Sequence, residues 1–133
     1  MTEYDHATPL VLVVEDELEV LTTLTHQVRQ LLPHAVIVAA QEGVGALTQI
    51  ADQTVDLAVV DYYLPGCGGA AIIGALKRHS PHVMTVLITA SPTVDVEEAL
   101  QLAGVDAILP KPFLLEELDH VIRILFPEAR REP

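Results

Sequence analysis

Carboxylate side chains follow directly after two apolar stretches of this chain, where they could bind a cation or act as a nucleophile. Glu15 and Asp16 come after the apolar run at 10–14, and Asp61 comes after the run at 57–60. If these carboxylates share a partly dry crevice they repel one another, so a cation must complete the group. Mg²⁺ suits such a set, because it binds one or two carboxylates, keeps several waters and takes phosphate oxygens as further ligands.

A hydroxyl group and an ammonium group follow two other apolar stretches. Thr89 comes after the run at 83–88, and Lys111 comes after the run at 107–109. Together with a divalent ion, Lys111 would balance the carboxylates, so that an anionic phosphoryl donor could approach. Asp61 is then the natural nucleophile, because a carboxylate that attacks phosphorus gives an aspartyl phosphate. Thr89 and Lys111 would bind the remaining phosphoryl oxygens.

Each of these residues also has an ordinary structural role open to it. Glu15 and Asp16 could simply cap the N-terminus of a helix. Asp61 could begin a turn, and Thr89 and Lys111 could be a satisfied hydroxyl and a solvated charge. The chemical interpretation therefore depends on their joint position at the same ends of several strands.

Short apolar runs alternate with stretches of helical spacing along the chain. The runs predict five strands, at 10–14, 36–39, 57–60, 83–88 and 107–109, with five helices between and after them, around 18–31, 44–51, 72–76, 96–103 and 114–125. This alternation predicts an α/β fold of (βα)₅ type around a parallel sheet. Because the carboxyl ends of parallel strands meet at one edge, the chemical groups above should meet there.

Length and composition indicate one acidic domain that folds by itself. The chain has 133 residues, half of them hydrophobic, and a formal net charge of -12. We expect an N-terminal tail at 1–9, a domain at 10–126, and at 127–133 a C-terminal tail or the start of a linker. The charge opposes direct contact with nucleic acid or anionic membranes. A single cysteine, no apolar run long enough to span a membrane and no signal-peptide pattern predict a cytoplasmic protein.

The motifs resemble the receiver domain of bacterial two-component response regulators, of the CheY-like superfamily, over most of the chain. The segments VLVVEDE, LAVVDYYLPGCGG, VLITAS and ILPKPF carry the resemblance. The resemblance implies a doubly wound, flavodoxin-like sheet of order 2-1-3-4-5. It also implies Asp61 as phosphoacceptor and Mg²⁺ as cofactor, with Asp16, Asp61 and the Tyr63 backbone carbonyl as direct metal ligands and Glu15 as a ligand through water.

The same resemblance implies a switch and its partners. Thr89, beside the small Ala90, would move toward the phosphate, and Lys111 would precede Pro112 through a cis peptide. The phosphoryl group would come from a histidine kinase or a histidine phosphotransfer protein that docks on the first helix and on the loop after the fifth strand. The readout would be a changed surface over the fourth helix, fifth strand and fifth helix, for a downstream protein or an attached output domain. No enzymatic activity beyond self-phosphorylation and self-dephosphorylation is expected.

Two features depart from the family pattern, the residue at 108 and the charge of the pairing face, and Tyr63 adds a further expectation. Ile108 stands where the family has a tyrosine or phenylalanine, so a subdued or different output is expected. Tyr63 could cover the acyl phosphate, obstruct water and slow dephosphorylation. Acidic residues crowd the face used for pairing in many family members, which predicts a monomer or another interface: Asp95, Glu97, Glu98, Asp106, Glu116, Glu117 and Asp119, with Arg123 as the main counterweight.

Other functions remain open from the sequence. A metal-dependent phosphatase or phosphotransferase would need a second aspartate two residues after the nucleophile, where Tyr63 stands, and a cap domain. A flavodoxin-like cofactor carrier would need a phosphate-cradling loop after the first strand, where Glu15 and Asp16 would repel an anion. A degenerate receiver that signals without phosphorylation is the remaining alternative.

Overall fold

The computed structural model describes residues 8–91 and 93–126. Within these ranges, strands and helices alternate in the order β1 (Leu10–Val14), α1 (Leu18–Leu31), β2 (Val36–Ala40), α2 (Gly43–Gln49), β3 (Leu57–Asp61), α3 (Gly68–His79), β4 (Met84–Thr89), α4 (Val94–Ala103), β5 (Ala107–Pro110) and α5 (Leu115–Leu125). The strands form one parallel sheet of order β2-β1-β3-β4-β5. The predicted (βα)₅ fold and strand order are confirmed.

The strand ends differ slightly from those predicted from the apolar runs. β3 continues through Asp61, which pairs with Ile88, and β4 runs from Met84 to Thr89, which pairs with Pro110. The backbone ladder, rather than side-chain polarity, decides where a strand stops. The two polar residues thus belong to the last positions of their strands, where the sheet fixes their backbones.

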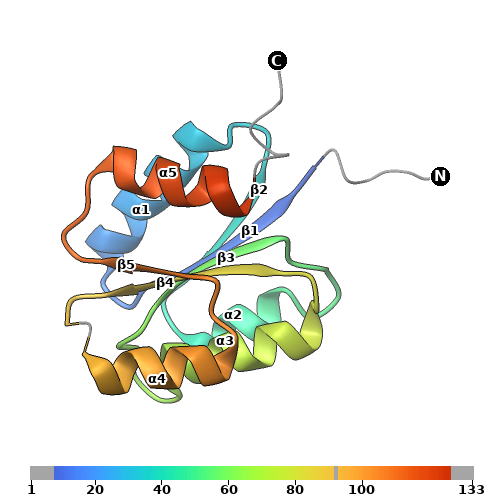
Figure 1. Ribbon diagram of the computed structural model, residues 1–133. Helices are drawn as coiled ribbons and strands as arrows, with labels where there is room; N and C mark the ends of the chain where they lie inside the picture. The colour runs from blue at the N-terminus through green and yellow to red at the C-terminus, as the bar shows by residue number, and fades with distance from the viewer. Residues whose placement is uncertain (1–7, 92, 127–133) are drawn as a thin grey trace.

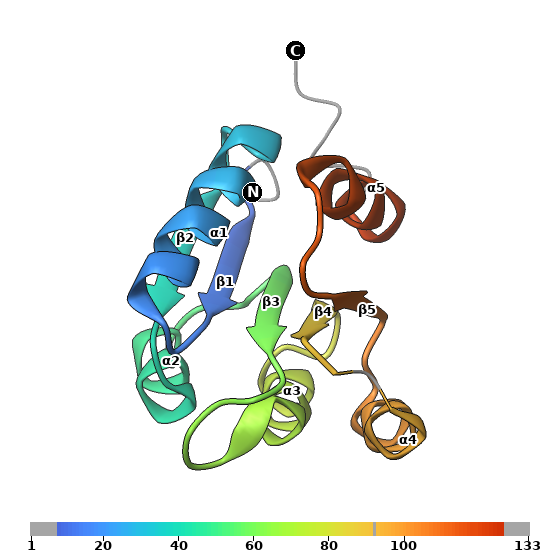
Figure 2. The ribbon, with the colours of Figure 1, turned by 90° about the vertical axis from the view of Figure 1, so that its left-hand side faces the viewer.

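The helices cover both faces of the sheet. Figures 1 and 2 show α1 and α5 on one face, and α2, α3 and α4 on the other. Side chains of β1 alternate between two cores: Leu12 and Val14 pack toward α2 and α3, whereas Val11 and Val13 pack toward α1 and α5. Both central strands, β1 and β3, are buried along their whole length, as expected for strands covered on both faces. None of the described helices is long and apolar enough to cross a membrane.

Helix α5 begins at a defined place because its first turn is capped. The carboxylate of Glu117 accepts a hydrogen bond of 2.7 Å from the backbone N–H of Leu114, a group that the helix itself leaves without a partner. Leu118 and Ile122 then bury one face of the helix against the sheet. This cap fixes the short segment that joins β5 to α5, in which Lys111 lies.

Asp106 ties α3, β4 and β5 together. Its carboxylate accepts hydrogen bonds from the Lys77 ammonium (2.9 Å), the Thr85 backbone N–H (2.8 Å) and the Thr85 hydroxyl (3.0 Å). Burial opposes ionisation, but these hydrogen bonds lower the pKa of Asp106 below its usual value. Asp106, one of the acidic residues expected on the pairing face, is therefore paired with Lys77 of the neighbouring helix.

Most of the predicted tails fall outside the described residues. Residues 1–7 and 127–133 belong to that part of the chain, so the domain boundaries at 9 and 126 stay predictions. Pro9, the last residue of the predicted N-terminal tail, is tied to β2, because its carbonyl oxygen accepts a hydrogen bond of 2.8 Å from the Val36 N–H.

Candidate functional site

The carboxylates of Glu15, Asp16 and Asp61 come together at the carboxyl edge of the sheet. One ligand oxygen from each lies within 4.8 Å of the others. They meet because β1 and β3 are adjacent and parallel with Val14 opposite Val60, so that the next residue of each strand reaches the same edge. Glu15 and Asp61 are buried, with 1% and 5% of their surface exposed. The predicted acidic pocket is present in the structure.

Lys111 brings the expected positive charge to this pocket. Its ammonium nitrogen lies 3.0 Å from a Glu15 carboxylate oxygen and 3.8 Å from an Asp61 carboxylate oxygen. Its backbone N–H donates to the Thr89 carbonyl at 2.8 Å, which holds the residue at the end of β5. Burial opposes its charge, but Glu15 and Asp61 raise the pKa of Lys111 above its usual value. The peptide between Lys111 and Pro112 is cis, as the sequence resemblance implied.

Glu15 is held in place on both sides of its carboxyl group. One oxygen accepts the hydrogen bond from Lys111, and the other accepts a hydrogen bond of 3.1 Å from the backbone N–H of Glu17. Among the three carboxylates, Asp16 and Asp61 therefore keep more of their oxygen lone pairs for a further ligand. That Glu15 binds a metal ion through water, with Asp16 and Asp61 as direct ligands, stays a prediction.

The ionisation of Asp61 is disfavoured in the pocket by itself. Burial and the neighbouring charges of Glu15 and Asp16 raise the pKa of Asp61 to about 6, although Lys111 and the backbone N–H of Tyr63 act in the opposite direction. A divalent cation would relieve this repulsion. The donors are hard carboxylate oxygens on a partly open site, which is the set that Mg²⁺ prefers, so the residues present fit this ion.

Thr89 ends β4, Ala90 follows it directly, and Ile108 lies on the neighbouring strand β5. Thr89 is fully buried at the end of β4, one residue beyond Ile88, which pairs with Asp61. Its hydroxyl accepts a hydrogen bond of 3.2 Å from the Ser91 N–H. Ala90 is exposed. Ile108 is half-buried and packs against the core under α2 and α3, so its side chain lies against the fold.

The tyrosine after the pocket is directed toward solvent. Tyr63 is 53% exposed, and its ring meets the ring of Tyr62 edge-on with centroids 4.8 Å apart. Tyr62 is half-buried and packs against the core. The exposed ring two residues after Asp61 is therefore supported from one side by Tyr62.

A close backbone contact lets α3 begin beside the end of β3. A Cβ atom on Gly69 would collide with the carbonyl oxygen of Asp61 and lie 2.8 Å from the Cα of Tyr62. The Gly69 N–H instead donates to the Tyr62 carbonyl at 2.9 Å. The sequence placed a glycine-rich loop here, but only the structure shows that Gly69 must lack a side chain for this loop to pack against Asp61.

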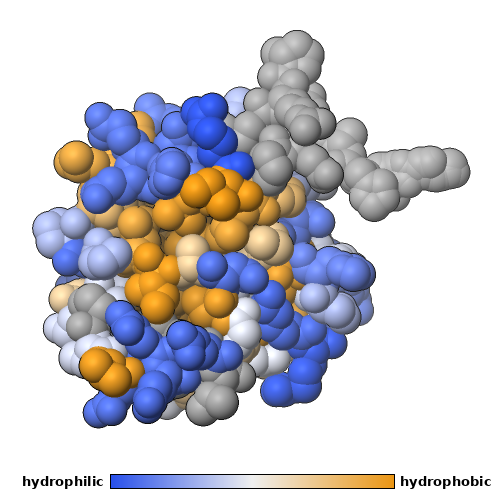
Figure 3. Space-filling view, viewed as in Figure 1, coloured by the Kyte–Doolittle hydropathy of each residue, from blue (hydrophilic) through white to orange (hydrophobic). Residues whose placement is uncertain are grey.

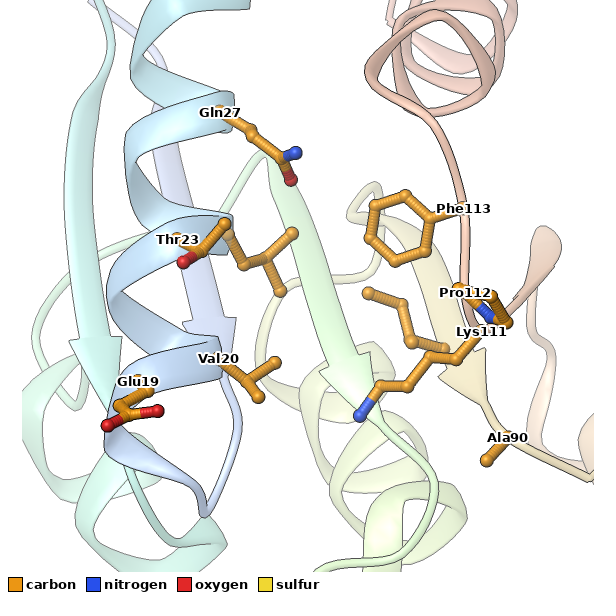
Figure 4. Close-up of a pocket in the computed structure, with 10 residues that line it drawn as sticks. Glu19, Val20, Thr23, Gln27, Ala90, Lys111, Pro112 and Phe113 are labelled. Atoms are coloured by element: carbon orange, nitrogen blue, oxygen red, sulfur yellow. The ribbon is translucent and has the colours of Figure 1, made fainter.

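A cavity of about 590 Å³ opens between α1 and the segment after β5. Figure 4 shows Lys111 reaching from this segment toward the end of β3, with Ala90 nearby. The walls are mostly apolar and include Val20, Thr23, Leu24, Gln27, Pro112 and Phe113. The docking region expected from the sequence uses the same two elements, on which Leu18, Leu114 and Leu115 are exposed. The helical spacing of residues 20, 23, 24 and 27 was the signal that could have identified the α1 wall.

Comparisons with known proteins agree on one family. The family model of the response regulator receiver domain matches residues 11–123. Transcriptional regulatory protein PrrA of Mycobacterium tuberculosis (strain ATCC 25618 / H37Rv) is 34% identical over 110 residues, which are 83% of this chain and 46% of the relative. Response regulator MprA of Mycobacterium sp. (strain KMS) is 38% identical over 79 residues, 59% of this chain and 34% of the relative. The chain thus spans less than half the length of these curated relatives.

Solved structures show the same fold. A CheY-like response regulator receiver domain protein from Methanospirillum hungatei JF-1 superposes with a TM-score of 0.83 at 20% sequence identity, covering 95% of this chain and 99% of that chain. The family match includes both central strands, all the carboxylates of the pocket and Lys111. The chain therefore belongs to the response regulator receiver domain family.

Proposed function

We propose that this receiver domain is a phosphoacceptor switch in a two-component phosphorelay and that Asp61 accepts the phosphoryl group. The observation that carries the proposal is the meeting of Glu15, Asp16 and Asp61 with Lys111 at one edge of the sheet. A buried carboxylate with a cation on one side and room for a metal ion is arranged to attack an anionic phosphorus centre.

Each residue of the pocket has a distinct task in the proposed transfer. The ionised Asp61 carboxylate forms the new P–O bond while the P–N bond of a phosphohistidine breaks, and the released imidazole nitrogen takes a proton from water. Lys111 holds one phosphoryl oxygen, and the hydroxyl of Thr89 donates to another. Bound Mg²⁺ would supply further charge neutralisation. The carboxylates of Asp16 and Asp61 and the carbonyl of Tyr63 would hold this ion directly, and Glu15 would hold it through water.

The donor is a histidine kinase or a histidine phosphotransfer protein that docks over α1 and the segment after β5. The cavity between these elements, with Leu18, Leu114 and Leu115 exposed around it, supports this placement. Phosphorylation would act through Thr89 on the surface of α4, β5 and α5, for a downstream protein or an attached output domain in the cytoplasm. The acidic charge of the chain favours a protein target over direct contact with nucleic acid.

The test is the intact mass of the protein after incubation with Mg²⁺ and acetyl phosphate. We expect one added phosphoryl group in the native chain and none in Asp61→Asn. Asp52→Asn is the matched control. Asp52 is exposed in the turn between α2 and β3, at the edge of the sheet opposite to Asp61, so this variant should gain the phosphoryl group as the native chain does. An Asp61→Asn variant that still gains the group, or a native chain that gains none from acetyl phosphate or from a histidine kinase, would overturn the proposal.

A further inference from the structure

Basic and acidic side chains are distributed unevenly over the two edges of the sheet. Exposed acidic residues begin three of the helices that surround the candidate site, at Glu17 and Glu19 of α1, Asp95 and Glu97 of α4, and Glu116 and Glu117 of α5. Basic residues instead stand in the last turns of helices, at Arg29, Lys77, Arg78 and Arg123. Because each helix runs antiparallel to the strands, the helix starts lie at the carboxyl edge, onto which Figure 2 looks, and the last turns at the other.

The acidic side chains around the site are not neutralised by the described residues. Lys111 is the sole lysine or arginine that the described chain places at the carboxyl edge, and it is already engaged by Glu15 and Asp61. Lys77 is paired with Asp106, and Arg123 is paired with Asp119. The exposed carboxylates of Glu19 and Glu116 form no ion pair within the described residues. The potential at the entrance to Asp61 is therefore strongly negative.

The two elements that form the apolar groove each carry or lead to an acidic residue, Glu19 and Glu116, which together are called the acidic rim. Glu19 of α1 lines the cavity next to Val20, and Glu116 stands in the first turn of α5, shortly after Phe113, which also lines the cavity. A segment that binds over both elements and inserts an apolar side chain between α1 and Phe113 comes near these carboxylates. Such a segment gains free energy from carrying basic residues and loses it from carrying acidic ones.

We infer that the phosphodonor of this domain presents its phosphohistidine among lysine and arginine side chains, which pair with the acidic rim at Glu19 and Glu116 while an apolar residue enters the groove. This inference rests on the proposed phosphoacceptor function and adds the chemistry of the partner. The same field repels small anionic donors, so a freely diffusing acyl phosphate reacts slowly at low salt and faster when salt screens the rim. A basic donor shows the opposite dependence on salt.

The test uses synthetic peptides that carry one phosphohistidine and the same apolar residues, flanked either by lysines or by glutamates. Phosphoryl uptake by the native chain with Mg²⁺ is followed by intact mass, first at low salt and then at roughly tenfold higher salt. We expect the lysine peptide to react at least about threefold faster than the glutamate peptide at low salt, and the difference to shrink at high salt. Uptake from acetyl phosphate should rise with salt.

Charge reversals locate the effect on the rim. Glu19→Lys and Glu116→Lys should slow uptake from the lysine peptide by about threefold and speed uptake from acetyl phosphate. Asp52→Lys makes the same charge change in an exposed position before β3, at the far edge, and should change neither rate by that amount. Equal rates from both peptides, or no effect of the rim variants, would overturn the inference and leave Asp61 as acceptor. No uptake from any donor would overturn the proposed function itself.

Discussion

The carboxyl group of Asp61 is placed where its own charge destabilises the folded chain. Its pKa of about 6 lies above the usual value of 3.8, so the folded state keeps the proton to higher pH than the unfolded state does. In the metal-free protein, the Asp61 carboxyl group therefore lowers the free energy of unfolding as the pH rises from 3.8 to about 6, and this loss of stability remains at higher pH. A site that binds a cation is expected to lower the stability of the folded chain when the cation is absent, because its carboxylates repel one another.

We predict that Asp61→Asn stabilises the metal-free protein at pH 8 by about 1 kcal/mol, a few degrees in Tm for a domain of this size. The difference from the native chain should narrow as pH falls toward about 4.5, because the native carboxyl group then becomes neutral as well. Thermal unfolding in the presence of a chelator measures both effects. Added Mg²⁺ should raise the Tm of the native chain more than that of the variant, and an equal rise in both would contradict a site that includes Asp61.

Tyr63 offers a second prediction, on the lifetime of the phosphorylated state. Tyr63 follows Asp61 by two residues, and its ring is exposed and contacts the ring of Tyr62. We expect Tyr63→Ala to shorten the half-life by about three- to tenfold, because water gains an open path to the acyl phosphate. Tyr63→Phe keeps the ring and should keep the native half-life. The decay of the phosphorylated mass after removal of the donor gives the measurement, and an unchanged half-life in Tyr63→Ala would disprove the shielding role.

Two of the three glycines in helix α3, Gly69 and Gly74, have opposite requirements. Gly69 has backbone atoms of Asp61 and Tyr62 where its side chain would be, whereas the nearest atom to a Cβ on Gly74 is an Arg78 side-chain nitrogen at 3.8 Å. We predict that Gly69→Ala destabilises the domain by about 2–4 kcal/mol and lowers phosphoryl uptake.

Gly74→Ala, in the same helix, should stabilise the domain by about 0.5–1 kcal/mol, because alanine favours a helix interior and meets open space there. Chemical denaturation of both variants gives the two free energies of unfolding. If Gly69→Ala were as stable as Gly74→Ala, the close approach of α3 to β3 would not be required.

Strand β5 carries Ile108, which we expect to limit the output. Ile108 packs against the core beside Leu87, its partner on β4, and has no aromatic ring to rotate. We predict that phosphorylation shifts the NMR signals of α4 less in the native chain than in Ile108→Tyr, because only the movement of Thr89 is then transmitted. A full shift of the α4 signals in the phosphorylated native chain would contradict this view.

At the scale of the molecule, the charge on the face formed by α4, β5 and α5 bears on whether two copies of the chain form a dimer. Figure 3 shows apolar side chains between α5 and the edge of the sheet, with hydrophilic side chains around them. The described basic residue of α5 on this face, Arg123, is paired within the helix to Asp119 at 2.9 Å. A symmetric dimer would therefore bring the acidic residues of this face in two copies together, and the described residues of this face offer no unpaired lysine or arginine to balance them.

We predict that the chain stays monomeric over a wide concentration range at moderate salt. Analytical ultracentrifugation should give one sedimentation coefficient, before and after phosphorylation. Arg123→Glu would remove this basic residue and should leave the monomer unchanged. A dimer that persists on dilution, and that Arg123→Glu dissociates, would show instead that this face pairs in spite of its charge.

The sequence by itself determined that there are five strands and that polar residues stand at their ends, although β3 and β4 each end one residue later than predicted. Continuous apolar runs must be buried on both faces, which requires a parallel sheet with covering helices, and such a sheet gathers its strand ends at one edge. Asp61 and Lys111 were therefore recognisable from position alone, together with Glu15 and Asp16 after the first strand. Their meeting in the structure follows from adjacent strands in register.

Only the tertiary structure decided how side chains from separate elements meet. The bond from Lys111 to Glu15 spans 96 positions, and the tie of Asp106 to Lys77 spans 29, so neither has a local pattern in the sequence. The close approach at Gly69 and the cavity beside α1 likewise depend on how the elements are spaced in the fold. Periodicity reports which face of an element is buried, but distances between elements are set by the packing of all their side chains together.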